Sequence, residues 1–234
     1  VGAEEVEAAL RSAAPGPVAE GSVGAGTGAA ALGWKGGVGT SSRRLPPSLG
    51  GYTLGCLVLT NFGGLLTVNG APVWRHLPGR PPRILREFVP QEAAGSADGG
   101  TSGGSVIVVL ATDAPLDGRN LCRLAARAIP GLARTGFYGA NGSGDFVLAF
   151  STARRIPHEP GPQLAPSSEL PNPAMDPLFL AAVEVTEEAV LNALLRATTV
   201  EGRDGHRLEA IPIDQLLEVL DRYGARRRPG GAGG

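Results

Sequence analysis

The stretch Ser105–Thr112, with the sequence SVIVVLAT, is an almost unbroken run of apolar and β-branched residues. Such a run is typical of a strand that is buried on both faces. The segment immediately before it, ADGGTSGG at residues 97–104, is rich in glycine and serine and is typical of a mobile linker. The predicted structure therefore changes at one bond, Gly104–Ser105, from a mobile linker to a core strand.

Other core elements are expected on both sides of this strand. Short apolar runs predict further strands at residues 29–34, 52–60 and 145–151. Helical spacing of apolar residues predicts helices at residues 3–13, 117–135, 176–197 and 214–223. In the second of these helices Pro130 should produce a kink and Gly136 should end it. Asn69 and Gly70, which follow an apolar run at 65–68, predict a hairpin turn.

The remaining segments are loops. Glycine and proline supply 36 and 20 of the 234 residues, close to a quarter of the chain. Segments 78–104 and 154–175 are polar and proline-rich, and we expect them to be loose loops, with a disordered tail at 225–234. With 234 residues the chain is long enough to bury a full core as one large or two small domains.

Composition excludes several classes of function. The net charge is −1, so nothing favours nucleic acid or an anionic membrane surface as a partner. No apolar run approaches the roughly 18–20 residues that span a bilayer, and the chain does not open with a signal segment. Cys56 and Cys122 lie in apolar contexts, which predicts buried free thiols and a reducing, cytoplasmic location. Val1 is not an initiator methionine, so we expect further residues upstream.

Two familiar kinds of ligand site are disfavoured. His76, His158 and His206 have no metal-binding spacing, so we expect loop histidines and no metal. The glycine run at residues 24–29 approaches a dinucleotide-binding fingerprint, but it lacks the preceding strand and the acid about 20 residues further on. Close backbone packing and a substrate groove lined by backbone amides are both left open as its explanation.

The remaining kind of candidate site is a serine nucleophile that supplies its own base. The sequence has no GxSxG turn and no histidine in the context of a general base. A serine nucleophile can instead use its own α-amine as the base, provided that it becomes N-terminal. The flexible glycine before Ser105 would let the Gly104 carbonyl reach the Ser105 hydroxyl, although the local pattern alone equally describes any loop that meets a strand.

Longer blocks of sequence carry a resemblance to a known family. The block SVIVVLATDAPLDGRNLCRLAARAIPGLARTG, followed by GSGDFVLAFST, closely resembles the DmpA-like family of self-processing aminopeptidases. That family includes the L-aminopeptidase D-amidase/esterases and the β-peptidyl aminopeptidases. GPVAEGSVGAGTG, KGGVGTSSR, YTLGCLVLTNFGG and EVTEEAVLNALLRATTVEGRDG match in the family's order, so the resemblance covers nearly the whole chain to about Tyr223.

The resemblance implies a role for each matching residue. Ser105 corresponds to the nucleophile, exposed when the bond after Gly104 breaks. Ser143 and Asp145 correspond to a second catalytic serine and its carboxylate partner, which would hold the proton of the Ser105 amine. Asn61 corresponds to the side-chain amide of the oxyanion hole.

The same resemblance implies the fold and the reaction. The expected fold is α/β (α+β layered): a four-layer αββα sandwich that is similar to Ntn hydrolases but differs in strand connectivity. Residues 1–104 would be the C-terminal part of an α chain and residues 105–234 a β chain, together forming one domain. Family members are commonly homo-oligomers, tetramers of such processed heterodimers. The implied activity is release of N-terminal amino acids from small peptides, amides or esters, without a metal or an organic cofactor.

The chain also departs from the family at its start. The family's first chain begins well upstream of Val1, and that stretch carries an acid that binds the substrate amine and an aromatic residue near the nucleophile. A truncated, unprocessed homologue that is inactive or only binds peptides is therefore the alternative function. A third is an amide hydrolase of the related nylon-oligomer type, which Ser105 disfavours because those relatives favour threonine.

Overall fold

The centre of the structure is one mixed sheet. The computed structural model describes residues 2–77, 79, 104–155, 158–159 and 168–226. The sheet has the order β3-β4-β5-β6, formed by β3 (Val38–Arg44), β4 (Thr53–Asn61), β5 (Ser105–Thr112) and β6 (Gly144–Ser151). The first two pairings are antiparallel, whereas β5 and β6 are parallel. A parallel pair needs a long crossover, and the helices between β5 and β6 provide it.

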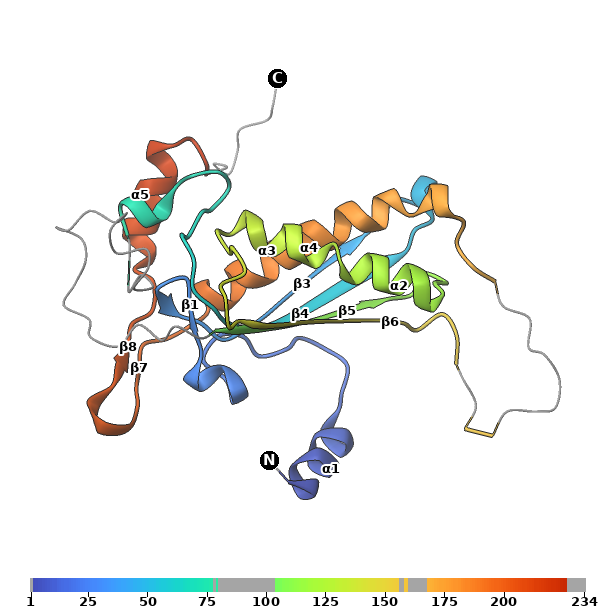
Figure 1. The fold of residues 1–234 in the computed structure, drawn as a ribbon, viewed down its shortest axis with the longest axis horizontal. Helices are drawn as coiled ribbons and strands as arrows, with labels where there is room; N and C mark the ends of the chain where they lie inside the picture. The colour runs from blue at the N-terminus through green and yellow to red at the C-terminus, as the bar shows by residue number, and fades with distance from the viewer. Residues whose placement is uncertain (1, 78, 80–103, 156–157, 160–167, 227–234) are drawn as a thin grey trace.

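One face of this sheet is covered by helices α2 (Gly118–Ala125), α3 (Ala128–Arg134) and α4 (Asp176–Leu195), as Figure 1 shows. α4 is the expected helix at 176–197, and Pro177 lies in its first turn, where a missing N–H costs no hydrogen bond. It packs across β3 and β4, with Val185, Ala189 and Ala193 fully buried. The main core therefore lies between the sheet and this helix layer.

The two faces of the sheet differ in exposure. On β5 the side chains of Val106, Val108 and Leu110 are fully buried beneath the helices. The alternate residue Ile107 is 40% exposed on the other face, and Phe146 and Leu148 of β6 are 65% and 60% exposed there. The expectation that β5 is buried on both faces is therefore wrong for the described residues, because they place a layer against one face only. The apolar second face is nevertheless typical of an inner sheet in a layered sandwich.

The layered α+β class is confirmed, and the described residues supply two adjacent layers of the expected four, one of helices and one sheet. Outside these layers lie α1 (Ala3–Ser12), which has no buried residue, and α5 (Ile213–Arg222), which packs through Leu216, Val219 and Leu220. The hairpin β7 (Val200–Glu201) and β8 (Arg207–Leu208) was not expected from the sequence. The described residues also form short 3₁₀ turns: η1 (Gly24–Gly28), η2 (Pro47–Leu49), η3 (Val73–Arg75), η6 (Asn172–Ala174) and η7 (Arg203–Gly205).

The helix expected at 117–135 is two helices, so the predicted kink at Pro130 is wrong. Asp117 caps α2 as expected, its carboxylate accepting from the Asn120 N–H at 2.7 Å. The break falls at residues 126 and 127, and Pro130 becomes the third residue of α3. Proline is tolerated there because the first N–H groups of a helix have no acceptor within the helix.

The glycine-rich segment forms a compact hairpin rather than the strand expected at 29–34. Its arms are β1 (Ala30–Ala31) and β2 (Trp34–Lys35), and Leu32 and Gly33 turn the chain with φ of 53° and 88°. A Cβ on Gly37 would lie 1.9 Å from the Gly21 carbonyl oxygen. A Cβ on Gly26 would lie 2.6 Å from the same oxygen, so close backbone packing explains Gly26 and Gly37, whereas a Cβ on Gly24 or Gly28 would meet nothing within 4 Å. The adjacent strand β3 was missed because its residues VGTSSRR are largely polar.

Smaller predictions have mixed outcomes. Asn69 and Gly70 form the expected turn, with φ of 50° and 82°, between the paired residues Val68 and Ala71. Ala225 and Arg226, at the start of the tail expected to be disordered, are described residues, and the Ala225 carbonyl accepts from the Asn69 side chain at 2.8 Å. Within the expected loops 78–104 and 154–175, residues 78, 80–103, 156–157 and 160–167 lie outside the described residues, as do residues 227–234.

The two cysteines differ. Cys56 is buried beside Thr186, and burial raises the pKa of its thiol to about 12. Cys122 is exposed on α2, so the prediction of two buried thiols is wrong for this residue. In the described part of the chain no helix combines the length and apolarity needed to cross a membrane.

Candidate active site

The candidate residues meet where three strands of the sheet end. Asn61 is the last residue of β4, Ser105 is the first of β5 and Gly144 is the first of β6. The register pairs Asn61 with Ser105 and Ser105 with Gly144. Residues 44 and 39 positions apart in the sequence are thus placed side by side by strand pairing alone.

The Gly104–Ser105 peptide has a defined geometry. The Ser105 hydroxyl donates to the Gly104 carbonyl oxygen at 2.7 Å, and the Gly144 backbone N–H donates to the same oxygen at 3.1 Å. A Cβ at Gly104 would lie 2.8 Å from the carbonyl oxygen of Asn61. A residue other than glycine at this position would therefore displace its neighbours. Two donors therefore hold the carbonyl that precedes the serine, and one of them is the serine's own hydroxyl.

Asn61 shares a face of the sheet with Ser105. Paired residues on neighbouring strands project their side chains to the same side, here the face without helices. The Asn61 Oδ1 accepts a hydrogen bond from the Ala30 N–H at 3.1 Å. This bond fixes the orientation of the amide and leaves its NH₂ group as a donor beside the nucleophile.

Ser143 and Asp145 form a hydrogen-bonded pair. The Ser143 hydroxyl donates to Asp145 Oδ1 at 2.6 Å, the short distance typical of a bond to a carboxylate. Asp145 pairs with Val106, so its side chain leaves the sheet on the face opposite to that of Ser105. No hydrogen bond joins Ser143 to Ser105 among the described residues of this uncut chain.

The histidines lie elsewhere. His76 is on the surface, 3.0 Å from the Tyr223 hydroxyl, and His206 is exposed in a turn beside η7. Within the described residues no three side chains of His, Cys, Asp or Glu are gathered as they would be around a metal ion.

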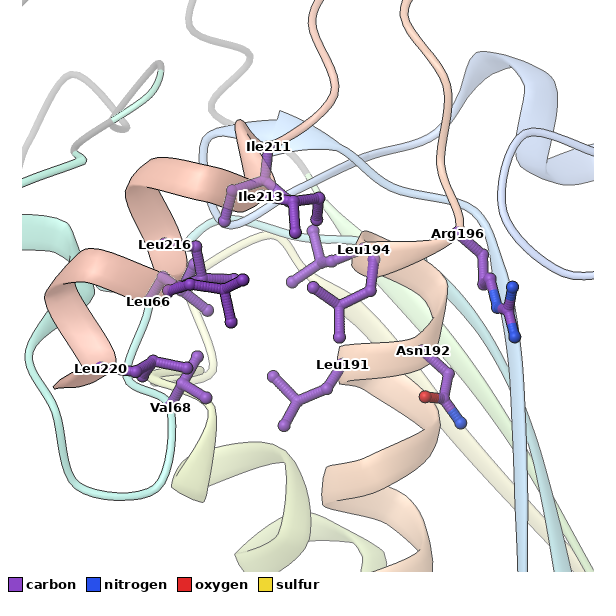
Figure 2. Close-up of a pocket in the computed structure, with 12 residues that line it drawn as sticks. Leu66, Val68, Leu191, Asn192, Leu194, Arg196, Ile211, Ile213, Leu216 and Leu220 are labelled. Carbon is purple, nitrogen blue, oxygen red and sulfur yellow. The ribbon is translucent and has the colours of Figure 1, made fainter. Parts of the chain in front are cut away.

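A pocket of about 420 Å³ lies away from these strand ends, between the end of α4 and α5. Figure 2 shows that its walls are leucine, isoleucine and valine side chains, whereas Asn192 and Arg196 point away from them. None of the candidate residues lines it, so it offers no reactive group to the chemistry considered above.

Two contributors to the site were missed from the sequence. The N–H of Gly144 holds the Gly104 carbonyl, and the N–H of Ala30 holds the Asn61 amide. Both are backbone groups, which every non-proline residue carries, so residue identity gives no signal for them.

Comparison with known proteins gives relatives across nearly the whole chain. The chain is 42% identical over 219 residues to the β-peptidyl aminopeptidase BapA of Sphingosinicella microcystinivorans, covering 92% of this chain and 54% of that protein. It is 38% identical to the β-peptidyl aminopeptidase BapA of Sphingosinicella xenopeptidilytica, covering 96% of this chain and 56% of that protein. The chain therefore spans about half the length of the curated relatives it matches.

Solved structures agree in fold. The PH0078 protein from Pyrococcus horikoshii OT3 superposes with a TM-score of 0.80 at 44% identity, over 94% of this chain and 57% of that one. The L-aminopeptidase D-Ala-esterase/amidase from Ochrobactrum anthropi, described as a variant of the Ntn hydrolase fold, gives 0.79 at 39% identity, over 95% and 58%. These matches confirm the resemblance to the DmpA-like enzymes and the Ntn-like class of the fold.

A family profile makes the assignment specific. The profile of peptidase family S58 matches residues 1–208, which include Asn61, Ser105, Ser143 and Asp145. Together with relatives 38–42% identical over more than nine tenths of the chain, this match establishes the family. The chain belongs to peptidase family S58.

Proposed function

We propose that this chain forms the catalytic part of a serine aminopeptidase that activates itself by cutting the Gly104–Ser105 bond. The observation that supports this proposal most directly is the contact between the Ser105 hydroxyl and the Gly104 carbonyl, 2.7 Å between oxygens, with the Gly144 N–H on the same carbonyl. A nucleophile is thus held beside the carbonyl of its own peptide, and a donor already faces the oxygen on which charge would develop.

Self-cleavage follows from this arrangement as an acyl shift. The Ser105 oxygen bonds to the Gly104 carbonyl carbon, the carbon–nitrogen bond breaks, and the nitrogen takes up the hydroxyl proton to become a free amine. Water then hydrolyses the resulting ester and leaves a carboxylate on Gly104. The products are a chain ending at Gly104 and a chain starting at Ser105.

Turnover uses the amine that cleavage releases. The Ser105 α-amine accepts the hydroxyl proton as the oxygen attacks a substrate carbonyl, and the Asn61 amide donates to the oxyanion. The Ser143–Asp145 pair holds and stabilises the ammonium that results. This ammonium then transfers its proton to the leaving group, and water releases the acyl group from Ser105.

The substrate is a small peptide, amide or ester with a free N-terminal residue. The names of the relatives support this class, since two are β-peptidyl aminopeptidases and a third is an L-aminopeptidase and D-Ala-esterase/amidase. The processed chains assemble into one domain and then into a homo-oligomer, a tetramer of heterodimers. The apolar open face of the sheet supports burial in a larger assembly. The two free thiols support a reducing, cytoplasmic location.

The first expected result is cleavage itself. The purified protein should yield a new N-terminus that reads SVIVV, because the Ser105 oxygen is already held against the Gly104 carbonyl. Intact-mass measurement and N-terminal sequencing of the purified protein check it. A single uncut chain after long incubation contradicts the proposal and favours the inert, peptide-binding homologue instead.

A glycine variant provides a control for the geometry. Gly104→Ala should slow cleavage at least tenfold, since its Cβ would lie 2.8 Å from the Asn61 carbonyl oxygen and displace the scissile carbonyl. Gly118→Ala is the matched control, because a Cβ there meets nothing within 4 Å. Equal cleavage rates for the two variants would show that the packing around Gly104 has no part in processing.

A second expected result concerns the base. The triple replacement of His76, His158 and His206 by Gln should leave most of the hydrolytic activity of the processed enzyme, because the proposed base is an amine. Steady-state kinetics on p-nitroanilide substrates measure it, with circular dichroism to check folding. A loss above about a hundredfold in the folded protein would point to a histidine triad and against an amine base.

A further inference from the structure

Lys35 carries a buried charge that the proposed chemistry leaves unused. It is the only lysine of the sequence and is 1% exposed. Its ammonium donates to three carbonyl oxygens, those of Gly26 at 2.6 Å, Ala29 at 2.8 Å and Gly36 at 2.8 Å. Among the described residues no carboxylate forms an ion pair with it. An ammonium is costly to bury, so three well-placed acceptors at this point are a specific arrangement.

One of these carbonyls leads directly to the candidate active site. The Ala29 carbonyl belongs to the same peptide unit as the Ala30 N–H, and that N–H donates to Asn61 Oδ1 at 3.1 Å. A positive charge at the oxygen end of a peptide unit draws electron density from its N–H and strengthens the bond that the N–H donates. The Asn61 amide is polarised in the same direction, which makes its NH₂ a stronger donor.

We propose that Lys35 is a positioning residue for the oxyanion hole, whose ammonium fixes and polarises the Asn61 side-chain amide through the peptide unit joining Ala29 to Ala30. This inference rests on the proposed role of Asn61 as the donor to the oxyanion. It assigns a function to the KGG stretch beyond the close packing of its glycines.

The segment that carries Lys35 is also held by hydrogen bonds that do not involve the peptide unit joining Ala29 to Ala30. The Thr60 hydroxyl, fully buried, accepts from the Gly37 N–H at 3.0 Å and donates to the Gly37 carbonyl at 3.1 Å. Thr60→Val removes these bonds and leaves the contacts of Lys35 in place. It is therefore a matched control for loosening of the segment without loss of the charge.

The test is a double-mutant cycle on the processed enzyme, with variants Lys35→Met, Asn61→Ala and the pair. Lys35→Met keeps the length of the side chain and removes the charge. In this variant the Gly26 carbonyl still accepts from the Ala29 N–H, and the Ala29 carbonyl still accepts from the Gly36 N–H. Lys35→Met should lower kcat about tenfold with KM unchanged, because the donor acts on the transition state. In the Asn61→Ala background it should lower kcat no further, whereas Thr60→Val should reduce thermal stability and leave kcat within about twofold.

The outcomes separate this inference from the proposed function. If Asn61→Ala lowers kcat but the effects of the two variants multiply, Lys35 acts on kcat independently of Asn61 and the inference fails. If Lys35→Met lowers thermal stability and leaves kcat unchanged, Lys35 acts only on stability and the inference fails as well. If Asn61→Ala hydrolyses at the parental rate, the assigned role of Asn61 fails first. Should Lys35→Met not fold, Lys35→Gln, which keeps a neutral donor, takes its place in the cycle with the same expected result.

A measurement on the parental protein needs no variant. With ¹⁵N-labelled lysine the protein should give one slowly exchanging ammonium resonance at pH 7, since Lys35 is the only lysine and is enclosed by carbonyls. Burial lowers the pKa of this ammonium, so the resonance also reports its protonation at the pH of activity. A neutral amine at the pH of activity would overturn the inference.

Discussion

Ser105→Ala is expected to leave the chain uncut and to abolish hydrolysis, with a loss of at least a thousandfold in kcat/KM. The substitution removes the oxygen that lies 2.7 Å from the Gly104 carbonyl oxygen, and no other described hydroxyl donates to that carbonyl. Loss of a covalent nucleophile typically costs several orders of magnitude, because what remains is binding and oxyanion stabilisation alone. Intact-mass measurement records the cleavage, and a p-nitroanilide assay records the hydrolysis.

Ser105→Cys is the informative companion to this variant. A thiol can make the same attack, so some cleavage should persist in the cysteine variant and none in the alanine variant. Both replacements are small and Ser105 is exposed, so folding should be preserved, which circular dichroism checks. Cleavage of Ser105→Ala at the parental rate would show that another residue or a protease cuts the chain.

Asp145→Asn is expected to reduce kcat by on the order of a hundredfold, which corresponds to about 3 kcal/mol of activation free energy. The asparagine keeps the shape of the side chain and can still accept from the Ser143 hydroxyl, 2.6 Å from the carboxylate in the parental chain. It removes the negative charge that would stabilise the Ser105 ammonium as the proton is transferred. The assay uses protein that has completed cleavage, so that slow processing is not mistaken for slow turnover.

A distant carboxylate provides the control for Asp145. Asp221 on α5 forms an exposed ion pair with Arg226, and Asp221→Asn should leave kcat unchanged because exposed pairs contribute little. If Asp145→Asn hydrolyses at the parental rate, the carboxylate is only structural. The assignment of the Ser143–Asp145 pair to catalysis is then wrong, while the role of Ser105 is unaffected.

Where residue patterns alone could decide local structure, the sequence predicted it well. The apolar runs of β4, β5 and β6 and the helical spacing of α4 and α5 correctly gave elements of the right type to within a few residues. These patterns failed to predict the local structure where backbone geometry determined it. β3 is largely polar because it lies at the end of the described sheet, and the strand expected at 29–34 became a hairpin through the turn at Leu32 and Gly33.

The amino-acid sequence by itself determined the candidate nucleophile, the bond that precedes it and the family, since these depend on residue identity and order along the chain. Only the tertiary structure decided how the site is held together. Strand register places Asn61 and Gly144 on either side of Ser105, and two backbone N–H groups hold the Gly104 carbonyl and the Asn61 amide. The contact of Lys35 with the Ala29 carbonyl also appears only in the folded chain. Backbone donors look alike in every sequence, and only folding determines which acceptors they meet.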